Sequence, residues 1–165
     1  MKSTTSFRIG IGHDSHRLVS GGPLRLGGID IPFNRHLDGH SDADVVLHAL
    51  TDALLGALAL GDIGDLFPND DAQNRGRDSS EFLLAAHDQV RAAGYQISNL
   101  DCTVFAEQPK LGTYKTVISQ RIAQLLGIDA GQVSIKAKTG EGVGPVGLGE
   151  TIEAHCVALL VRIPE

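Results

Sequence analysis

Apolar and polar residues alternate in the first part of the chain and then give way to one long apolar segment. Phe7 to Ile11 has the alternation of a strand, and residues 23–32 show it on both sides of the pair Gly27-Gly28, which is typical of a β-hairpin. Between Val45 and Leu60, apolar residues lie almost all round a helix. The pattern therefore predicts a strand, a hairpin and then a buried helix that ends at Gly61.

Polar residues mark the start of this helix and the connection after it. Ser41 and Asp44 stand three residues apart, which fits a capping box with Ser41 at the N-cap. Asp42 and Asp44 are more typical of a helix start than of metal ligands. Residues 62–71 are rich in Asp and predict a tight, acidic connection.

The second half of the chain continues as a mixture of helices and strands. We expect a helix from Ser79 or Ser80 to about Gly94, a strand from Ile97 to Ala106, a helix from about Thr113 to Leu126, a strand from Val133 to Lys138, a glycine-rich loop from Thr139 to Gly149 and a strand from Thr151 to Ile163. No repeat or linker interrupts this order. The sequence therefore predicts a single domain over residues 1–165, an α/β (α+β) sandwich in which helices pack on one face of a mixed β-sheet.

Composition restricts the classes of function. The 165 residues carry a net charge of −6 without a basic cluster, which argues against nucleic-acid binding. No apolar run approaches the roughly 20 residues that span a membrane, and the start MKSTTSFRIG lacks the apolar core of a secretory signal. Cys102 and Cys156 lie in apolar stretches and are expected to be reduced core thiols. We expect a cytoplasmic protein with a small-molecule partner.

Two histidines and an aspartate form a candidate metal site. Asp14 and His16 are two residues apart, so in an extended chain their side chains point to the same face, whereas His13 and Ser15 point to the other. His48 is a polar residue within the buried helix and needs a partner. A catalytic zinc site has three protein ligands and an open position. The alternative for His48 is a core histidine bonded to a backbone carbonyl.

Two further segments are candidates for phosphate binding. His40 and Ser41 lie at the start of the buried helix, where free N–H groups favour anions; alternatively, Ser41 only caps the helix and His40 is solvated. Lys138, Thr139 and Glu141 begin the glycine-rich loop and could serve a diphosphate and its divalent ion. The alternative here is an ordinary polar loop.

The segment Gly142 to Gly147 matches the dinucleotide-binding pattern G-x-G-x-x-G. That pattern requires a helix after the last glycine, because the helix N-terminus receives the pyrophosphate. A β-branched strand is predicted here instead. We therefore exclude dinucleotide binding at this loop.

Four blocks of the sequence resemble one enzyme family. The blocks GIGHDSHRL, HSDADVVLHALTDALLGALALGDIGDLFPND, AEQPKLG and KAKTGEGVG occur in the order and with the spacings of the 2-C-methyl-D-erythritol 2,4-cyclodiphosphate synthases, and the second block is highly specific. The resemblance implies a cyclising phosphorus-oxygen lyase of the non-mevalonate isoprenoid pathway. Its substrate would be 4-diphosphocytidyl-2-C-methyl-D-erythritol 2-phosphate, whose 2-phosphate attacks the β-phosphorus and expels CMP.

The resemblance also implies roles for particular residues. Asp14, His16 and His48 match the family's Zn²⁺ ligands, Glu141 matches the carboxylate that holds Mg²⁺ or Mn²⁺, and His40 and Thr139 match residues that stabilise the transition state. The matching substrate contacts are Ser41, Asp62, Ile63, Gly64, Phe67, Asn69, Asp71, Ala106, Lys110, Leu111, Gly112, Ala137 and Lys138.

The family likeness further implies a homotrimer with active sites between subunits. The C-terminal loop departs from many relatives, which have an aromatic residue at the position of Pro145 and an arginine at that of Leu148. Because that arginine holds isoprenoid diphosphates on the trimer axis of some members, we do not expect such a ligand here. Lys138 and Gly140 also replace threonines of some members.

Two other functions remain open at this point. A metal-dependent hydrolase could use the same Asp-His-His set with Asp44 as the general base, and a non-catalytic zinc- or nucleotide-binding module would need no turnover. The remaining histidines are expected to be structural or surface residues; they are His13, His36, His87 and His155.

Overall fold

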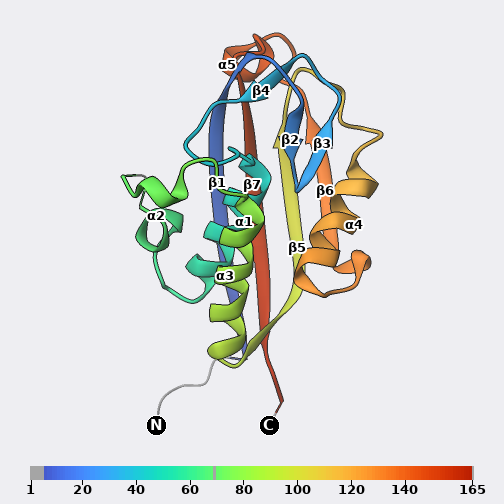
Figure 1. Ribbon diagram of the computed structural model, residues 1–165. Helices are drawn as coiled ribbons and strands as arrows, with labels where there is room; N and C mark the ends of the chain where they lie inside the picture. Colours follow the sequence, from blue (N-terminus) through green and yellow to red (C-terminus); the bar gives the residue numbers. More distant parts are fainter. Residues whose placement is uncertain (1–5, 69, 165) are drawn as a thin grey trace.

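A five-stranded sheet runs the length of the molecule (Figure 1). The computed structural model describes residues 6–68 and 70–164. In sheet order the strands are β4 (Arg35–Leu37), β1 (Phe7–Ser20), β7 (Thr151–Arg162), β5 (Tyr95–Phe105) and β6 (Val133–Lys138). β5 and β6 are parallel, and the other neighbours are antiparallel. The predicted mixed sheet is therefore confirmed.

The predicted hairpin is also confirmed. It consists of β2 (Leu24–Leu26) and β3 (Ile29–Ile31), which form a separate two-stranded sheet. Gly27 and Gly28 make the turn with φ of 61° and 77°. These left-handed conformations are favourable for glycine, which has no Cβ atom.

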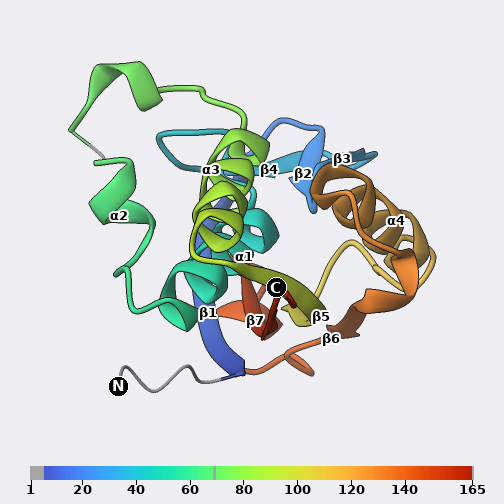
Figure 2. The same ribbon diagram turned by 90° about the horizontal axis from the view of Figure 1, so that it is seen from below.

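The long helices cover one face of the five-stranded sheet (Figure 2). The three long ones are α1 (Val45–Ala57), α3 (Ser79–Ala92) and α4 (Lys115–Leu126); the short ones are α2 (Ile63–Leu66), α5 (Gly144–Gly147) and the 3₁₀ turns η1 (Ala72–Asn74) and η2 (Ala130–Gln132). Burial alternates along β7, so that every second side chain faces the helices. The predicted single-sided layering is thus confirmed. Within the described residues, none of the helices has both the length and the apolar character needed to cross a membrane.

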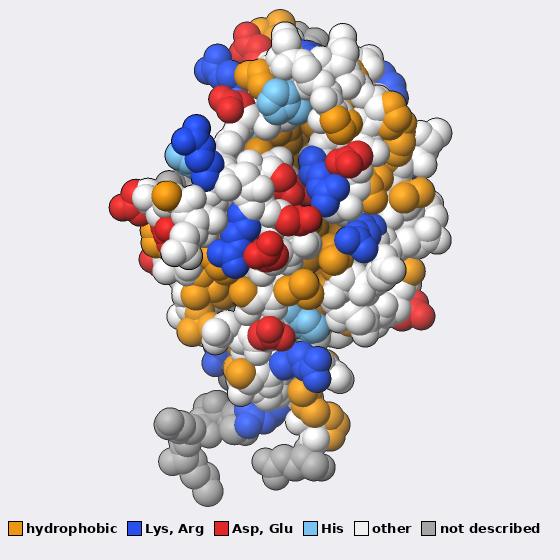
Figure 3. Space-filling model, in the orientation of Figure 1, with side chains coloured by type: hydrophobic (Ala, Val, Ile, Leu, Met, Phe, Trp, Pro, Cys, Tyr) orange, Lys and Arg blue, Asp and Glu red, His pale blue; other side chains and the backbone are white. Residues whose placement is uncertain are grey.

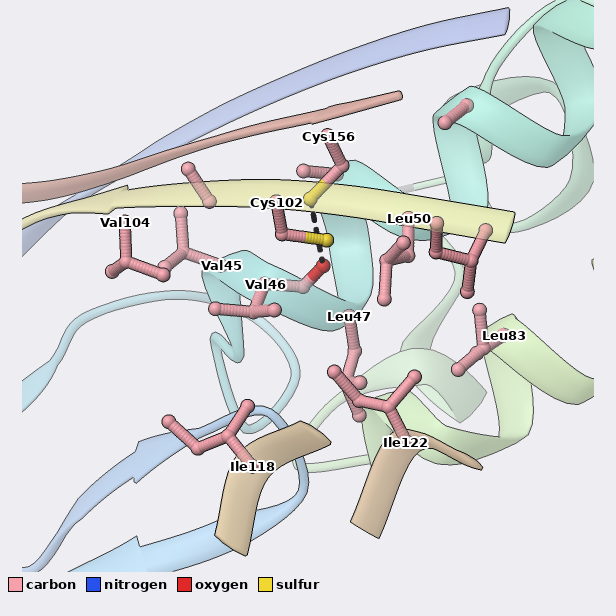
Figure 4. Close-up of a cluster of buried hydrophobic side chains, with 14 of the residues drawn as sticks. Val45, Val46, Leu47, Leu50, Leu83, Cys102, Val104, Ile118, Ile122 and Cys156 are labelled. Carbon is pink, nitrogen blue, oxygen red and sulfur yellow. Dashed lines mark hydrogen bonds between the residues drawn. The ribbon is translucent and has the colours of Figure 1, made fainter. Parts of the chain in front are cut away.

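The core is centred on α1 (Figure 4). Leu47 and Leu50 of α1 are fully buried and face Ile118 and Ile122 of α4 and Leu83 of α3. Cys102 and Cys156 lie opposite each other on β5 and β7, and both are buried free thiols, as predicted. Because α1 is enclosed by the sheet and by two helices, most of its side chains are buried.

The predicted helix caps need correction. Asp44, not Ser41, is the N-cap of α1, and Asp78, rather than Ser79 or Ser80, is the N-cap of α3. The Asp44 carboxylate is fully buried and accepts hydrogen bonds from the N–H groups of Gly27, Gly28, Val46 and Leu47 at 2.7–3.2 Å. A single Asp side chain thus joins the hairpin turn to the helix start, which the shorter Ser41 side chain does not do.

Several element limits also differ from the expectation. α1 ends at Ala57 rather than at Gly61, because Ala59 takes a φ of 57° and stops the helix. The acidic connection contains the short helix α2, which Asp62 caps. β1 continues through Asp14 and His16 to Ser20, and β4 pairs with its end. The loop predicted from Thr139 to Gly149 contains the short helix α5 (Gly144–Gly147), and strand β7 follows it.

The side of the sheet away from the helices is partly apolar and uncovered in the single chain. Ile9 and Ile11 of β1 are 70% and 69% exposed on it, and Val157, Leu159 and Val161 of β7 share this face. On the helix side, by contrast, Lys and Arg are interspersed among Asp and Glu (Figure 3). Large apolar side chains are therefore exposed on the side of the sheet away from the helices.

Two glycines of β1 allow α1 to lie directly on the strand. A Cβ atom added at Gly12 would overlap the carbonyl oxygen of Ala49, and one at Gly10 would overlap that of Ala53. Any larger side chain at these positions would push the helix away from the sheet. The glycines therefore set the distance between β1 and α1.

We expect Gly12→Ala to lower the free energy of unfolding by about 1–3 kcal/mol, because overpacking forces a shift of the helix backbone. Gly56→Ala is the matched control on α1. An added Cβ there meets only the Ile11 carbonyl oxygen at 3.8 Å, so this change should be neutral or stabilising by up to about 1 kcal/mol. Urea unfolding of both variants measures the difference, and equal stabilities would contradict the close-packing argument.

Candidate active site

Strand β1 and helix α1 bring together Asp14, His16 and His48. Asp14 and His16 point to the helix side of β1, and His48 lies in the first turn of α1. Asp14 Oδ2 lies 2.9 Å from His16 Nε2 and 2.9 Å from His48 Nδ1, and the two nitrogens are 3.3 Å apart. A tetrahedral ion with bonds of about 2.1 Å separates its ligand atoms by about 3.4 Å. The three atoms are therefore placed to hold one metal ion.

Hydrogen bonds orient both imidazoles toward the centre of this cluster. His16 Nδ1 lies 2.8 Å from the carbonyl oxygen of Asp38 and can only donate to it, which leaves the Nε2 lone pair for a metal. His48 Nε2 lies 2.7 Å from Ser79 Oγ, and Ser79 in turn donates to the Asp42 carboxylate. Ser79 therefore accepts the Nε2 proton of His48, which leaves Nδ1 to bind a metal ion or, when it carries a proton, to donate to the Asp14 carboxylate at 2.9 Å.

Charge and burial act against each other in the metal-free cluster. Burial opposes ionisation of Asp14, but hydrogen bonds from His16 and His48 outweigh it and lower the pKa of the carboxyl well below its usual range. Burial likewise disfavours the charged form of His16, yet the bonds to Asp14 and to the Asp38 carbonyl raise its pKa. A metal ion would displace the proton that this cluster otherwise favours.

A pocket of about 220 Å³ opens beside the cluster. Its lining comprises Asp14, His16, Gly39, His40, Ser41, His48, Ile63, Phe67, Asn74 and Phe82. Ser41 Oγ lies 3.1 Å from His48 Nε2 and accepts the N–H of Ala43, so it borders the pocket without capping the helix. The rings of Phe67 and Phe82 pack with their centroids 4.4 Å apart and form the apolar wall of the pocket.

Helix α2 forms one side of this pocket. Ile63 lines it, and the Ile63 N–H donates to Asp52 Oδ1 at 2.7 Å, which attaches α2 to α1. Asp62 instead accepts the N–H groups of Gly64 and Asp65 at the exposed start of α2. Asp71 caps the turn η1. Asn69 lies outside the described residues.

A second pocket of about 290 Å³ contains the other predicted substrate residues. Its lining comprises Ala106, Lys110, Leu111, Gly112, Lys115, Ala137, Lys138 and Thr139. It lies where β6 and the loop after β5 end, whereas the metal cluster lies on β1. Since β7 and β5 stand between β1 and β6, the strands are separated by about 14 Å. Glu141 is exposed two residues beyond Thr139 and is not part of the cluster.

Some residues around the cluster were not found from the sequence. Asp38, Asp42, Ser79 and Asp52 contact the ligands or the pocket wall through hydrogen bonds between segments far apart in the chain. Their spacing carries no signal for such contacts. Asp44, the base required by a hydrolase, is fully buried and occupied by four N–H groups, so the structure does not support that alternative.

We expect Ser79→Ala to weaken binding of a divalent transition metal by the cluster about 10- to 100-fold, because the Nε2 proton of His48 loses its acceptor. Competition with a chromogenic chelator measures the affinity. Ser134→Ala, at an exposed position of β6, is the control. Equal affinities for the two variants would show that Ser79 does not orient His48.

Comparison with known proteins identifies relatives along nearly the full length. Residues 7–161 match the model of the YgbB family. The chain is 49% identical over 156 residues to the 2-C-methyl-D-erythritol 2,4-cyclodiphosphate synthase of Gemmatimonas aurantiaca, which covers 94% of both proteins. It is 51% identical over 157 residues to the synthase of Rhodopirellula baltica, covering 95% of both.

Solved structures show the same fold. The IspF protein of Plasmodium falciparum, solved as a CDP complex, has a TM-score of 0.86 and 35% identity, and the match covers 98% of this chain and 100% of that one. The bifunctional IspDF of Campylobacter jejuni has a TM-score of 0.92 and 38% identity; the match covers 95% of this chain and 42% of the longer protein. The chain therefore belongs to the YgbB family, that of the 2-C-methyl-D-erythritol 2,4-cyclodiphosphate synthases.

Proposed function

We propose that this protein cyclises 4-diphosphocytidyl-2-C-methyl-D-erythritol 2-phosphate to 2-C-methyl-D-erythritol 2,4-cyclodiphosphate and releases CMP, in the non-mevalonate isoprenoid pathway. The observation that carries the proposal is the cluster of Asp14, His16 and His48 beside an open pocket, in a chain of this family. The names of the relatives support the reaction, and the CDP complexes among the similar structures support a cytidine diphosphate group in the substrate.

Zn²⁺ is the metal that this cluster fits. Two imidazoles and one carboxylate are a usual ligand set for catalytic zinc, and a fourth position stays open for substrate. When bound, such an ion polarises a phosphoryl oxygen. Glu141 would hold Mg²⁺ or Mn²⁺ on the diphosphate, because an exposed carboxylate can share such an ion with phosphate oxygens.

The protein side chains have to position one flexible molecule for ring closure. The nucleophile is the substrate's own phosphate, so catalysis rests on orientation and charge neutralisation. His40, beside the cluster, and Thr139, in the second pocket, would stabilise the transition state. Asp62, Ile63 and Gly64 would contact the methylerythritol part. The remaining contacts would be Ser41, Phe67, Asn69 and Asp71, and on the cytidine side Ala106, Lys110, Leu111, Gly112, Ala137 and Lys138.

We further propose a homotrimer in which each active site combines the metal cluster of one subunit with the second pocket of its neighbour. The separation of the two pockets within one chain supports this arrangement. The uncovered apolar sheet face, with Ile9 and Ile11, supports burial between subunits. A cytoplasmic location and the absence of an isoprenoid diphosphate ligand at Leu148 stay predictions.

Incubation of the purified protein with the 2-phosphate substrate and Mg²⁺ tests the reaction. We expect phosphorus NMR to show CMP and the cyclic diphosphate in equal amounts. His48→Ala should lose the ion held with Asp14 and His16 and lower kcat by about 10²- to 10⁴-fold, which corresponds to several kcal/mol of transition-state stabilisation. His36→Ala, on β4 outside the pocket, is the control.

Two results of this assay would contradict the proposal. CMP with a linear product would indicate hydrolysis, and binding of CDP without turnover would indicate a binding module. Full metal content in His48→Ala would contradict the ligand set.

Lys110→Ala should raise KM about 10- to 100-fold with little change in kcat, because a charged hydrogen bond remote from the reacting phosphorus contributes to ground and transition state alike. Initial rates over a range of substrate concentrations measure both constants. Lys136→Ala is the control, since its Nζ pairs with Asp101 at 2.7 Å outside the second pocket. A large fall in kcat at unchanged KM would place Lys110 at the reacting centre instead.

A further inference from the structure

The uncovered face of the sheet carries a second group of metal-ligating side chains. His13 of β1 and Glu153 and His155 of β7 lie together there. His13 and His155 are direct partners in the antiparallel register, and Glu153 is two residues before His155 on the same face. All three side chains are thus held by two adjacent central strands rather than by loops.

The geometry of this group is close to that of a metal site. The His13 and His155 rings have centroids 4.5 Å apart, and His13 Nε2 lies 3.7 Å from Glu153 Oε2. One ligand atom of each residue lies within 4.8 Å of the others. Since an ion with bonds of about 2.1 Å needs separations of about 3.4 Å, rotation of the half-exposed His13 and of Glu153 can close the remaining gap.

The residue types select the class of ion. Two imidazoles with one carboxylate suit zinc and neighbouring divalent transition metals, whereas Mg²⁺ and Ca²⁺ prefer oxygen ligands. A simple ion pair of His13 with Glu153 would need a protonated imidazole and would involve only two of the three side chains. A metal ion uses all three with neutral imidazoles. The ring of Phe105 packs edge-on against the ring of His155, with centroids 5.3 Å apart, and limits the rotation of the imidazole.

We propose that His13, Glu153 and His155 form a second site for a divalent transition-metal ion of the zinc type, with water at the open position. The site is separate from the first cluster, because His13 and Asp14 are consecutive residues of a strand and point to opposite faces of the sheet. The proposal does not depend on the proposed reaction. It places metal on the face that we assign to subunit contact.

Equilibrium dialysis of the full chain against Zn²⁺ tests the proposal. Chelator-stripped protein is dialysed over a range of free Zn²⁺, and bound zinc is measured by elemental analysis. We expect the cluster of Asp14, His16 and His48 to bind zinc more tightly than the second site. Wild type should bind more zinc at saturation than either His13→Asn or His155→Asn, and both variants should retain the tightly bound zinc of that cluster. His48→Asn should lose this tightly bound zinc and retain the more weakly bound zinc of the second site. His87→Asn, on α3, is the control and should match wild type.

Two results of this experiment would contradict the proposal. Equal saturation of wild type, His13→Asn and His155→Asn would overturn the second site. Excess Mg²⁺ should leave zinc bound at the second site. Displacement of this zinc by Mg²⁺ would contradict the assignment to a transition metal. Either failure would leave the cyclisation assay unchanged, so it would be distinguishable from failure of the proposed function.

Discussion

The direct contact between β1 and α1 determines the geometry of the candidate active site. Gly10 and Gly12 have no side chains, and the backbone of α1 at Ala49 and Ala53 occupies the space that a Cβ atom would fill. This approach brings His48, one residue before Ala49, within 2.9 Å of the Asp14 carboxylate. In a more widely spaced packing, helix and strand could not supply ligands to the same ion. The metal cluster is therefore a consequence of the close backbone packing between β1 and α1.

Carboxylates at the N-terminal end of α1 hold this arrangement in place. Asp44 connects the hairpin turn to the first N–H groups of α1. Asp42 accepts from Ser79 and pairs with Arg25 at 3.6 Å, and Arg25 also pairs with Asp78, the N-cap of α3. The starts of α1 and α3 are thus linked through charged groups next to His48. These links fix the orientation of the imidazole as well as the positions of the helices.

Local patterns in the sequence predicted most elements but not their exact ends. The strand Val133–Lys138 and the end of α4 at Leu126 agree with the expectation because alternation and a following glycine mark them clearly. The caps of α1 and α3 were wrong because several adjacent Ser and Asp residues could each cap, and tertiary hydrogen bonds decide among them. β4 was missed because it is only three residues long.

For the site, the predicted group of Asp14, His16 and His48 could be assembled from strand alternation and from one polar residue in an apolar helix. Its orienting partners could not, because the contacts of Asp38 and Ser79 join segments between 22 and 31 residues apart. The distance between the two pockets also depends on strand order, which no local pattern specifies. His13 and His155 were expected to be structural or surface residues because their pairing across β1 and β7 is visible only in the fold.

The two-sided character of β1 also affects which sequence changes this strand can tolerate. Side chains at even-numbered positions such as 14 and 16 face the helices, and side chains at odd-numbered positions such as 9, 11 and 13 face the opposite side. Deleting one residue near the start of β1 would exchange the two sets of side chains. Ile9 and Ile11 would then point toward α1, and the Asp14 carboxylate would point away from it. Point replacements, in contrast, alter one side and spare the other. The strand can thus diversify on either surface independently, provided that its length is preserved.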